Sequence, residues 1–198
     1  MKYSTVLMFG CPGSGKGTQG VVIGRLPNLV HLAMGDIFRA LDKVSEIGKE
    51  FVSYASKGLL VPDELTLRLF LQHVEGLVAD KEIDPEYHTL ILDGIPRTTT
   101  QVELLNNVVE VKRIIHLMMK DRDALIARLA ARATKSNRPD DADHGVITLR
   151  IEVYERETFP VLEQYPQELI AEVNADQPPL AVVRDVADAL VGVISPRI

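Results

Sequence analysis

A glycine-rich segment that directly follows an apolar run is the feature that most constrains this chain. The run TVLMF at 5–9 is typical of a short buried strand, and the segment GCPGSGKGTQ follows it at Gly10. Its glycines allow backbone N–H groups to turn inward, so that with Lys16 and a helix N-terminus they form a cradle for an oligophosphate. The usual loop has Ser or Thr directly after the lysine. Here Gly17 takes that place, and the hydroxyl comes one residue later, at Thr18.

Short apolar runs alternate with helical patterns along the whole chain of 198 residues. Strands are expected at 5–9, 29–33, 89–92, 113–118 and 169–173. Helices are expected at 16–26, 36–41, 45–57, 63–78, 101–109, 122–133, 146–164 and 179–194, the seventh with a kink at Pro160. This alternation predicts an α/β domain whose parallel sheet is covered on both faces. Ligands are then expected at the carboxyl ends of the strands, in the segments GCPGSGKGT, AMGD, DGIPR and VNADQ.

Composition excludes several classes of protein. The net charge is −6, which argues against a general nucleic-acid binder. No apolar run approaches the roughly 18 residues of a membrane span, so we expect a cytoplasmic protein with no membrane contact. The single cysteine, Cys11, excludes an internal disulfide and a cysteine-rich zinc site. We interpret Cys11 as a small filler residue; the alternative is a reactive thiol whose pKa is lowered by Lys16.

Arginines recur just beyond strand ends and on helix faces. Planar guanidinium groups suit phosphate oxygens, so one phosphate loop with several arginines indicates two phosphorylated ligands. The five histidines are scattered, and none is a convincing base beside the loop. A phosphate monoester is largely dianionic near pH 7 and needs no base, so the pattern favours transfer from one phosphate to another. The arginines in question are Arg39, Arg97, Arg128, Arg132, Arg138 and Arg150.

Several segments, in order along the chain, resemble those of the adenylate kinases. GCPGSGKGTQ matches the family's GxPGxGKGTQ loop, including the glycine after lysine, and LDGIPRTTTQ is similar to L-D-G-F-P-R-T-x-x-Q. AMGDIFR, KGLLVPDEL, RLAARATKSNRPDD and VNADQPP resemble further family segments, the third in its short-lid form. The resemblance implies a P-loop three-layer fold with a five-stranded parallel sheet. It implies one domain, 1–198, with its core at 1–32, 62–130 and 142–198, a small helical NMP-binding lobe at 33–61 and a short lid at 131–141.

The same resemblance implies a reaction and a donor site. The expected reaction is reversible, Mg²⁺-dependent phosphoryl transfer from ATP to AMP, giving two ADP. Arg128 would lie on the ATP adenine, and Gln177 would contact that base. Asp93 would hold the hydrated Mg²⁺ through water, with Thr18 a further candidate ligand, and no structural zinc is implied. The ATP phosphates would lie against Gly13, Ser14, Gly15, Lys16, Gly17 and Thr18.

On the acceptor side, the resemblance implies that arginines clamp the AMP phosphate and that Gln101 reads the adenine edge. The residues expected at AMP are Met34, Arg39, Leu59, Leu60, Val61, Gly94, Arg97, Gln101, Arg138 and Arg150. The residues expected to act in catalysis are Lys16, Arg97, Arg132, Arg138 and Arg150. The lobe and the lid would close on the substrates and expel water. A monomer is expected, with ATP and AMP as its partners.

The sequence departs from the family pattern at the acceptor site. Ala33-Met34 replaces Ser-Thr before Gly-Asp, and Ile95 replaces an aromatic residue. A thioether packs on a purine but gives little hydrogen-bond specificity. A UMP/CMP kinase or a broad-specificity nucleoside monophosphate kinase therefore remains an alternative, although Gln101 favours adenine. The alternative from another class is a nucleotide-binding module that has lost catalysis.

Overall fold

The computed structural model describes residues 2–136, 141 and 143–194. Its centre is a sheet of five parallel strands in the order β2-β3-β1-β4-β5. Because each strand is followed by helical segments, the connections can return over the faces of the sheet, as parallel pairing requires. The strands are β1 (Tyr3–Gly10), β2 (Leu29–Ala33), β3 (Thr89–Asp93), β4 (Val109–Met118) and β5 (Ile170–Asn174). The α/β fold class and the five-stranded parallel sheet are thereby confirmed.

Alternate residues of the central strand β1 enter two different cores. Leu7 and Phe9 pack in a core that also contains apolar side chains of α4 and α5, whereas Val6 and Met8 pack in a core with α1 and α8. This alternation is the two-residue period of a strand buried on both faces. The register places Leu7 beside Leu92 of β3.

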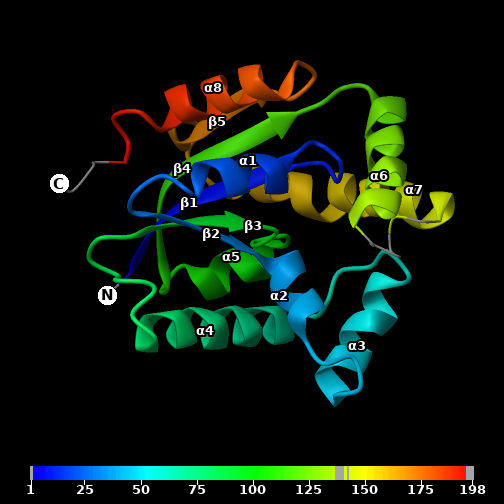
Figure 1. The fold of residues 1–198 in the computed structure, drawn as a ribbon, viewed down its shortest axis with the longest axis horizontal. Helices are drawn as coiled ribbons and strands as arrows, with labels where there is room; N and C mark the ends of the chain where they lie inside the picture. The colour runs from blue at the N-terminus through cyan, green and yellow to red at the C-terminus, as the bar shows by residue number, and fades with distance from the viewer. Residues whose placement is uncertain (1, 137–140, 142, 195–198) are drawn as a thin grey trace.

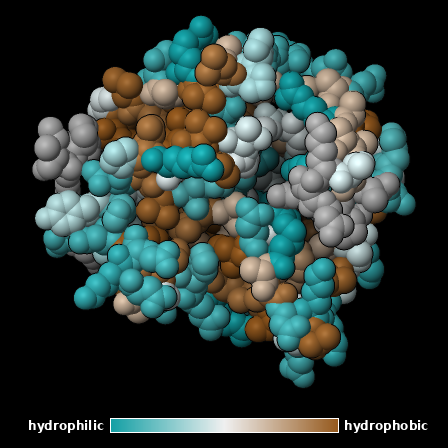
Figure 2. All heavy atoms as spheres, in the orientation of Figure 1, coloured by the Kyte–Doolittle hydropathy of each residue, from teal (hydrophilic) through white to brown (hydrophobic). Residues whose placement is uncertain are grey.

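The helices cover the sheet and build two projections beside it. In Figure 1, α6 and α7 lie together at one end of the molecule, and α3 stands away from the sheet. On the face in Figure 2, apolar side chains gather over α1 and α8. Among the residues described, no helix is both long and apolar enough to cross a bilayer. The helices are α1 (Lys16–Ile23), α2 (Met34–Ala40), α3 (Glu46–Ala55), α4 (Asp63–Ala79), α5 (Thr99–Leu105), α6 (Arg122–Ser136), α7 (His144–Val153) and α8 (Pro179–Leu190).

Several of the expected helices are wrong in extent; α1 ends at Ile23 and α8 at Leu190, and for two others the structure shows the physical reason. The helix expected at 101–109 ends at Leu105, and β4 begins at Val109 because this residue pairs with Tyr3 of β1. The helix expected at 146–164 ends as an α-helix at Val153, continues as a π-helical turn and finishes as a 3₁₀ helix. Pro160 has no N–H to donate, so a regular α-helix cannot run through it.

Candidate active site

A cavity of about 910 Å³ opens at the carboxyl ends of the strands. Its wall is formed by the loops after β1, β2, β3 and β5, together with α6 and α7. Arg138 lies outside the described residues, and every other predicted site residue lines this cavity. The fold therefore brings the separate sequence segments to one place. The predicted residues in the wall are Gly13, Ser14, Gly15, Lys16, Gly17, Thr18, Met34, Arg39, Leu59, Leu60, Val61, Asp93, Gly94, Arg97, Gln101, Arg128, Arg132, Arg150 and Gln177.

The loop after β1 has the backbone conformation that its glycines permit. Gly13 and Gly15 have φ values of 89° and 100°, in the left-handed region that other residues rarely adopt. Gly15 is the N-cap residue of α1, and no side chain caps the first turn of this helix. The N–H groups of that turn are therefore available to an anion, as in other helix N-termini that bind phosphate. The Ser14 hydroxyl is buried there without a hydrogen-bond partner.

Lys16 supplies the positive charge of the cradle. Its ammonium donates to the carbonyl oxygens of Gly10, at 2.6 Å, and Cys11, at 3.3 Å. Desolvation lowers the pKa of Lys16 to about 8, although the nearby Asp93 carboxylate acts in the opposite direction. An anionic phosphate in the cradle would stabilise the charged ammonium and raise this pKa again.

The thiol of Cys11 does not have the properties of a reactive cysteine. Burial raises the pKa of Cys11 to about 11, and this effect exceeds the opposite influence of Lys16. The side chain packs against the apolar cluster of α6 and α7 that contains Leu125 and Leu129. Since a thiol is nucleophilic only as the thiolate, the interpretation of Cys11 as a filler residue is the better one.

Two further arginines, Arg39 and Arg97, line the cavity. Arg97 follows the turn after β3, and its Nε donates to the carbonyl oxygen of Gly94 at 3.0 Å. Arg39, on α2, pairs with Asp36 at 2.6 Å. Both guanidinium groups remain in the cavity wall, where their other N–H groups can meet a phosphate.

Gln101 joins this turn to the first turn of α4. The Gln101 Oε1 accepts from the backbone N–H of Arg97 at 2.7 Å, and its Nε2 donates to Asp63 at 2.7 Å. Thr98 caps α5 by accepting from the N–H of Gln101 at 3.1 Å. The sequence signal for this arrangement is the capping pattern T-x-x-Q at the start of the helix. It does not reveal Asp63, which lies 38 positions earlier in the chain.

One buried carboxylate holds two arginines of the cavity wall together. Asp141 is 1% exposed and accepts from Arg132 of α6 at 2.6 and 3.1 Å. It also accepts from Arg150 of α7. Sequence reasoning identified both arginines but did not identify Asp141. The only indication of Asp141 in the sequence is the repeated aspartate in RPDD, and this pattern is equally typical of a solvent-exposed loop.

Arg128 and Gln177, the two residues that were predicted to contact the ATP base, both line the cavity near the loop after β5. Arg128 donates to the carbonyl oxygen of Ala175 at 3.3 and 3.4 Å. Gln177 follows two residues later and donates to Asp185 of α8 at 2.6 Å. Together, α6 and the loop after β5 therefore place an arginine face and backbone polar groups at this end.

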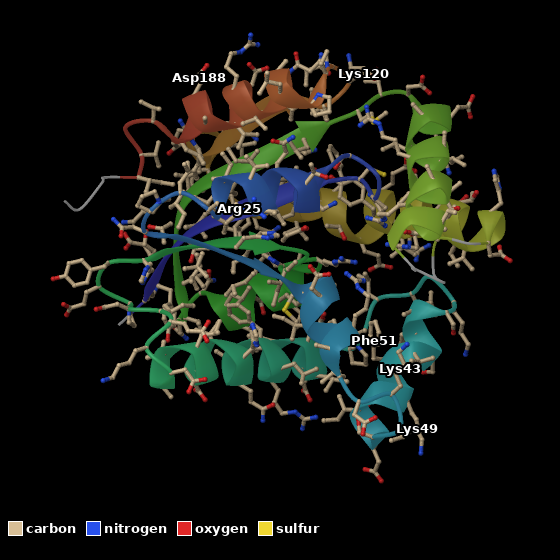
Figure 3. The ribbon with its side chains drawn as sticks, in the orientation of Figure 1. Arg25, Lys43, Lys49, Phe51, Lys120 and Asp188 are labelled. Atoms are coloured by element: carbon tan, nitrogen blue, oxygen red, sulfur yellow. The ribbon has the colours of Figure 1, made fainter. Side chains whose placement is uncertain are left out.

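Aromatic and thioether side chains line the other end of the cavity. Met34 is 2% exposed, and Phe38 stacks on Phe51 with ring centroids 5.0 Å apart and planes 3° apart. Figure 3 labels Phe51 on α3, from where it reaches the α2 side chain. Phe38 and Phe51 were not predicted, because their spacing is that of ordinary core residues. An apolar wall of this kind suits the flat face of a base.

Tyr154 is a further wall residue that the sequence did not reveal. It begins the π-helical turn, and its hydroxyl lies 3.4 Å from Nε2 of His116 on β4. Burial raises the pKa of Tyr154 above its ordinary value, so the hydroxyl stays protonated. π-turns are frequent at functional sites, but the sequence carries no simple pattern that marks one.

The space beside Asp93 can accommodate a hydrated cation. A Cβ at Gly17 would lie 3.5 Å from the Asp93 Oδ2, so the glycine leaves room next to this carboxylate. Thr18 shares the same wall. Carboxylate and hydroxyl oxygens with several waters are the donors that Mg²⁺ prefers. Among the described residues, no cluster of three or more histidine, cysteine or acidic side chains could hold a metal by itself.

Known proteins are similar in sequence to this chain over most of its length. A family model described as adenylate kinase matches residues 8–170. An adenylate kinase of Cyanothece sp. is 34% identical over 197 residues, covering 94% of this chain and 96% of its own. One from Leifsonia xyli subsp. xyli is 36% identical over 191 residues, covering 93% and 92%. One from Kocuria rhizophila is 35% identical over 165 residues, covering 81% and 84%. With most of its length matched, the chain belongs to the adenylate kinase family of phosphotransferases.

Proposed function

We propose that this kinase transfers the terminal phosphoryl group of ATP to AMP and forms two ADP. The observation that carries the proposal is a single cavity with anion-binding groups at two places. The loop with Lys16 lies at one, and Arg39 and Arg97 lie at the other. An arginine face at Arg128 and an apolar wall at Phe38 extend beyond these groups, which provides two places for bases.

In the proposed mechanism, the donor phosphates lie in the cradle of the loop after β1. The N–H groups of the first turn of α1 and the Lys16 ammonium bind their oxygens. Arg39 and Arg97 fix the acceptor phosphate, whose own anionic oxygen attacks. Arg132 and Arg150, held by Asp141, stabilise the charge on the phosphoryl group in flight. Catalysis then consists of alignment and charge stabilisation, since the acceptor needs no base.

The proposal includes Mg²⁺ bound with ATP. Asp93 would hold the hydrated ion through water, and the hydroxyl of Thr18, in the same cavity wall, is a further candidate ligand. When bound, the ion neutralises charge on the donor phosphates. The position of Gly17 supports this assignment, because a Cβ there would already be in van der Waals contact with the Asp93 Oδ2 at 3.5 Å, and the glycine leaves this space to water.

We also propose that two segments move during turnover. Residues 33–61 would form the lobe that covers the acceptor, and residues 131–141 would form the lid over the donor. The positions of α3 away from the sheet and of α6 beside α7 support this division. All proposed binding groups come from one chain, so we propose that the enzyme works as a monomer.

A direct test measures ATP consumption with Mg²⁺ and separately AMP, CMP, UMP or GMP. Strong preference for AMP, with two ADP formed per ATP consumed, is the expected result. Comparable rates with CMP or UMP would favour the broad-specificity alternative and implicate Met34. Binding of ATP without transfer to any acceptor would contradict the proposed function.

A further inference from the structure

The side-chain amide of Gln101 is buried and held at both ends. The residue is 2% exposed and lines the acceptor end of the cavity. Its Oε1 accepts from the backbone N–H of Arg97, and its Nε2 donates to the carboxylate of Asp63, each at 2.7 Å. These two partners come from different elements, the turn after β3 and the first turn of α4.

The two partners permit only one orientation of this amide. A backbone N–H can only donate and a carboxylate can only accept, whereas an amide can turn over to exchange its oxygen and nitrogen. Turning the Gln101 amide over would set its NH₂ group against the Arg97 N–H and its oxygen against the Asp63 carboxylate. Both hydrogen bonds would be lost at a buried site, and the second would become a repulsion between oxygens.

The fixed amide has one lone pair on Oε1 and one N–H on Nε2 that these bonds leave unused. A 6-amino purine has the matching edge, because its N6 amino group donates and its N1 accepts. A 6-keto purine has the opposite edge, because its O6 accepts and its N1–H donates. A site that cannot change its donor and acceptor pattern rejects the mismatched base, since buried polar groups are then left unpaired.

We infer that Asp63 is a positioning residue that selects 6-amino over 6-keto purine monophosphates by fixing the orientation of Gln101. The inference rests on the proposed function, in which AMP is the acceptor. Of the two partners that orient Gln101, only Asp63 can be removed by a substitution, because the other partner is the backbone N–H of Arg97. Its carboxylate acts through Gln101 and does not touch the substrate.

The test compares kcat/KM for AMP and for IMP, which has nearly the size of AMP but carries the inverted edge. Asp63→Asn replaces a carboxylate, which only accepts, with an amide, which can also donate. The Gln101 amide can then turn over and still form a hydrogen bond with residue 63, so that only the bond with the Arg97 N–H is lost. The AMP-to-IMP ratio should fall about tenfold or more, since a hydrogen bond to a charged group is involved. Asp63→Ser should give the same fall and serves if the asparagine variant does not fold.

Glu64→Gln is the matched control. Glu64 is the next residue, is exposed, and also carries a negative charge in the first turn of α4. The control therefore loses the same charge at the same helix N-terminus. Its AMP-to-IMP ratio should stay within about twofold of the wild-type ratio.

An unchanged ratio in Asp63→Asn, or an equal loss with both acceptors, would overturn the inference and leave the proposed function intact. Equal falls in Asp63→Asn and Glu64→Gln would also overturn it, because helix charge would then be the cause. A wild-type enzyme that transfers no phosphate to AMP would overturn the proposed function itself, and this inference with it.

Discussion

Lys16 places a desolvated ammonium group in the phosphate loop before any ligand is bound. Its ammonium is desolvated under the loop and rests on two carbonyl oxygens, of Gly10 and Cys11. Burial favours the neutral amine, and a bound polyphosphate would favour the ammonium. The protonation state of this single residue should therefore change when a nucleotide binds.

ATP binding should consequently take up a proton in alkaline solution. The pKa of Lys16 is about 8 in the free protein, so part of the population is neutral above that pH. Bound phosphates raise the pKa, and binding near pH 9 should take up close to one proton, with little uptake near pH 7. Titration calorimetry in buffers of different ionisation enthalpy measures this number. Lys16→Met should abolish the uptake, and a binding heat independent of buffer near pH 9 would contradict the prediction.

Arg97 should matter for the acceptor far more than an exposed arginine does. Arg97→Ala removes a guanidinium that the Gly94 carbonyl orients in the cavity. We expect kcat/KM for AMP to fall by an amount equivalent to about 2–4 kcal/mol, with a smaller effect on the KM for ATP. Arg68→Ala, at an exposed position of α4, is the control and should have nearly wild-type kinetics. Wild-type rates for Arg97→Ala would remove Arg97 from the site.

Met34 should limit the discrimination between acceptor bases. Met34→Thr places a hydroxyl in the cavity wall where the thioether now lies, and it should raise the AMP-to-CMP preference about tenfold. Met34→Leu, which adds no hydroxyl, should leave that preference unchanged. Because Met34 is only 2% exposed, the threonine variant should also lose about 1–3 kcal/mol of stability. The ratio of acceptors is therefore the decisive measurement, and an unchanged ratio would count against this role.

At the scale of elements, α1 and β2 approach each other more closely than most side chains would allow. A Cβ at Gly20 would lie 2.2 Å from Nε2 of His31, and one at Gly24 would lie 2.6 Å from the His31 Cβ. Gly20 weakens α1 as an isolated helix, whereas Gly24 is its C-cap residue. In the fold, the two glycines let the ring of His31 lie directly against the end of α1. The lower helix propensity of glycine is therefore offset by close packing between α1 and β2.

Gly20→Ala should therefore destabilise the protein, although alanine is the better helix former. We expect the free energy of unfolding to fall by about 1–3 kcal/mol, because the His31 ring must move out of a packed position. The matched control is Gly76→Ala in α4, where a Cβ would meet nothing within 4 Å. That variant should gain about 0.5–1 kcal/mol. Denaturant unfolding measures both, and equal effects of the two substitutions would contradict the packing argument.

At the scale of the whole molecule, the cavity lies where separate parts of the chain meet. Residues of the proposed lobe, such as Phe51, and of α6 and α7, such as Arg132 and Arg150, share one wall with the sheet loops. A cavity of about 910 Å³ is large for a reaction that must exclude water. The proposed lobe and lid would reduce it when both substrates bind.

Closure should be visible in solution. The radius of gyration from small-angle X-ray scattering should fall when a non-hydrolysable ATP analogue and AMP are both present. AMP alone should slow hydrogen exchange mainly in 33–61, and the ATP analogue alone mainly in 131–141. Scattering and exchange that do not change with both ligands bound would contradict the division into core, lobe and lid.

The sequence by itself determined the fold class, the phosphate loop and most of the charged residues that line the cavity, but not wall residues such as Phe38, Phe51 and Tyr154. These features follow from local patterns, namely apolar runs, glycines at a turn, and arginines just beyond strand ends. Local patterns also indicated that strands and helices alternate along the chain. This alternation predicts parallel strands, because a parallel pair needs a crossover connection, usually a helix.

Only the tertiary structure decided where 101–109 changes from helix to strand, because Val109 pairs with Tyr3, which lies near the N-terminus and far from it in the sequence. It alone revealed Asp63 beside Gln101 and the stacking of Phe38 on Phe51. The physical reason is that a single carboxylate or ring has no periodic pattern. Its role is set by the partner that the fold brings within hydrogen-bonding or van der Waals distance.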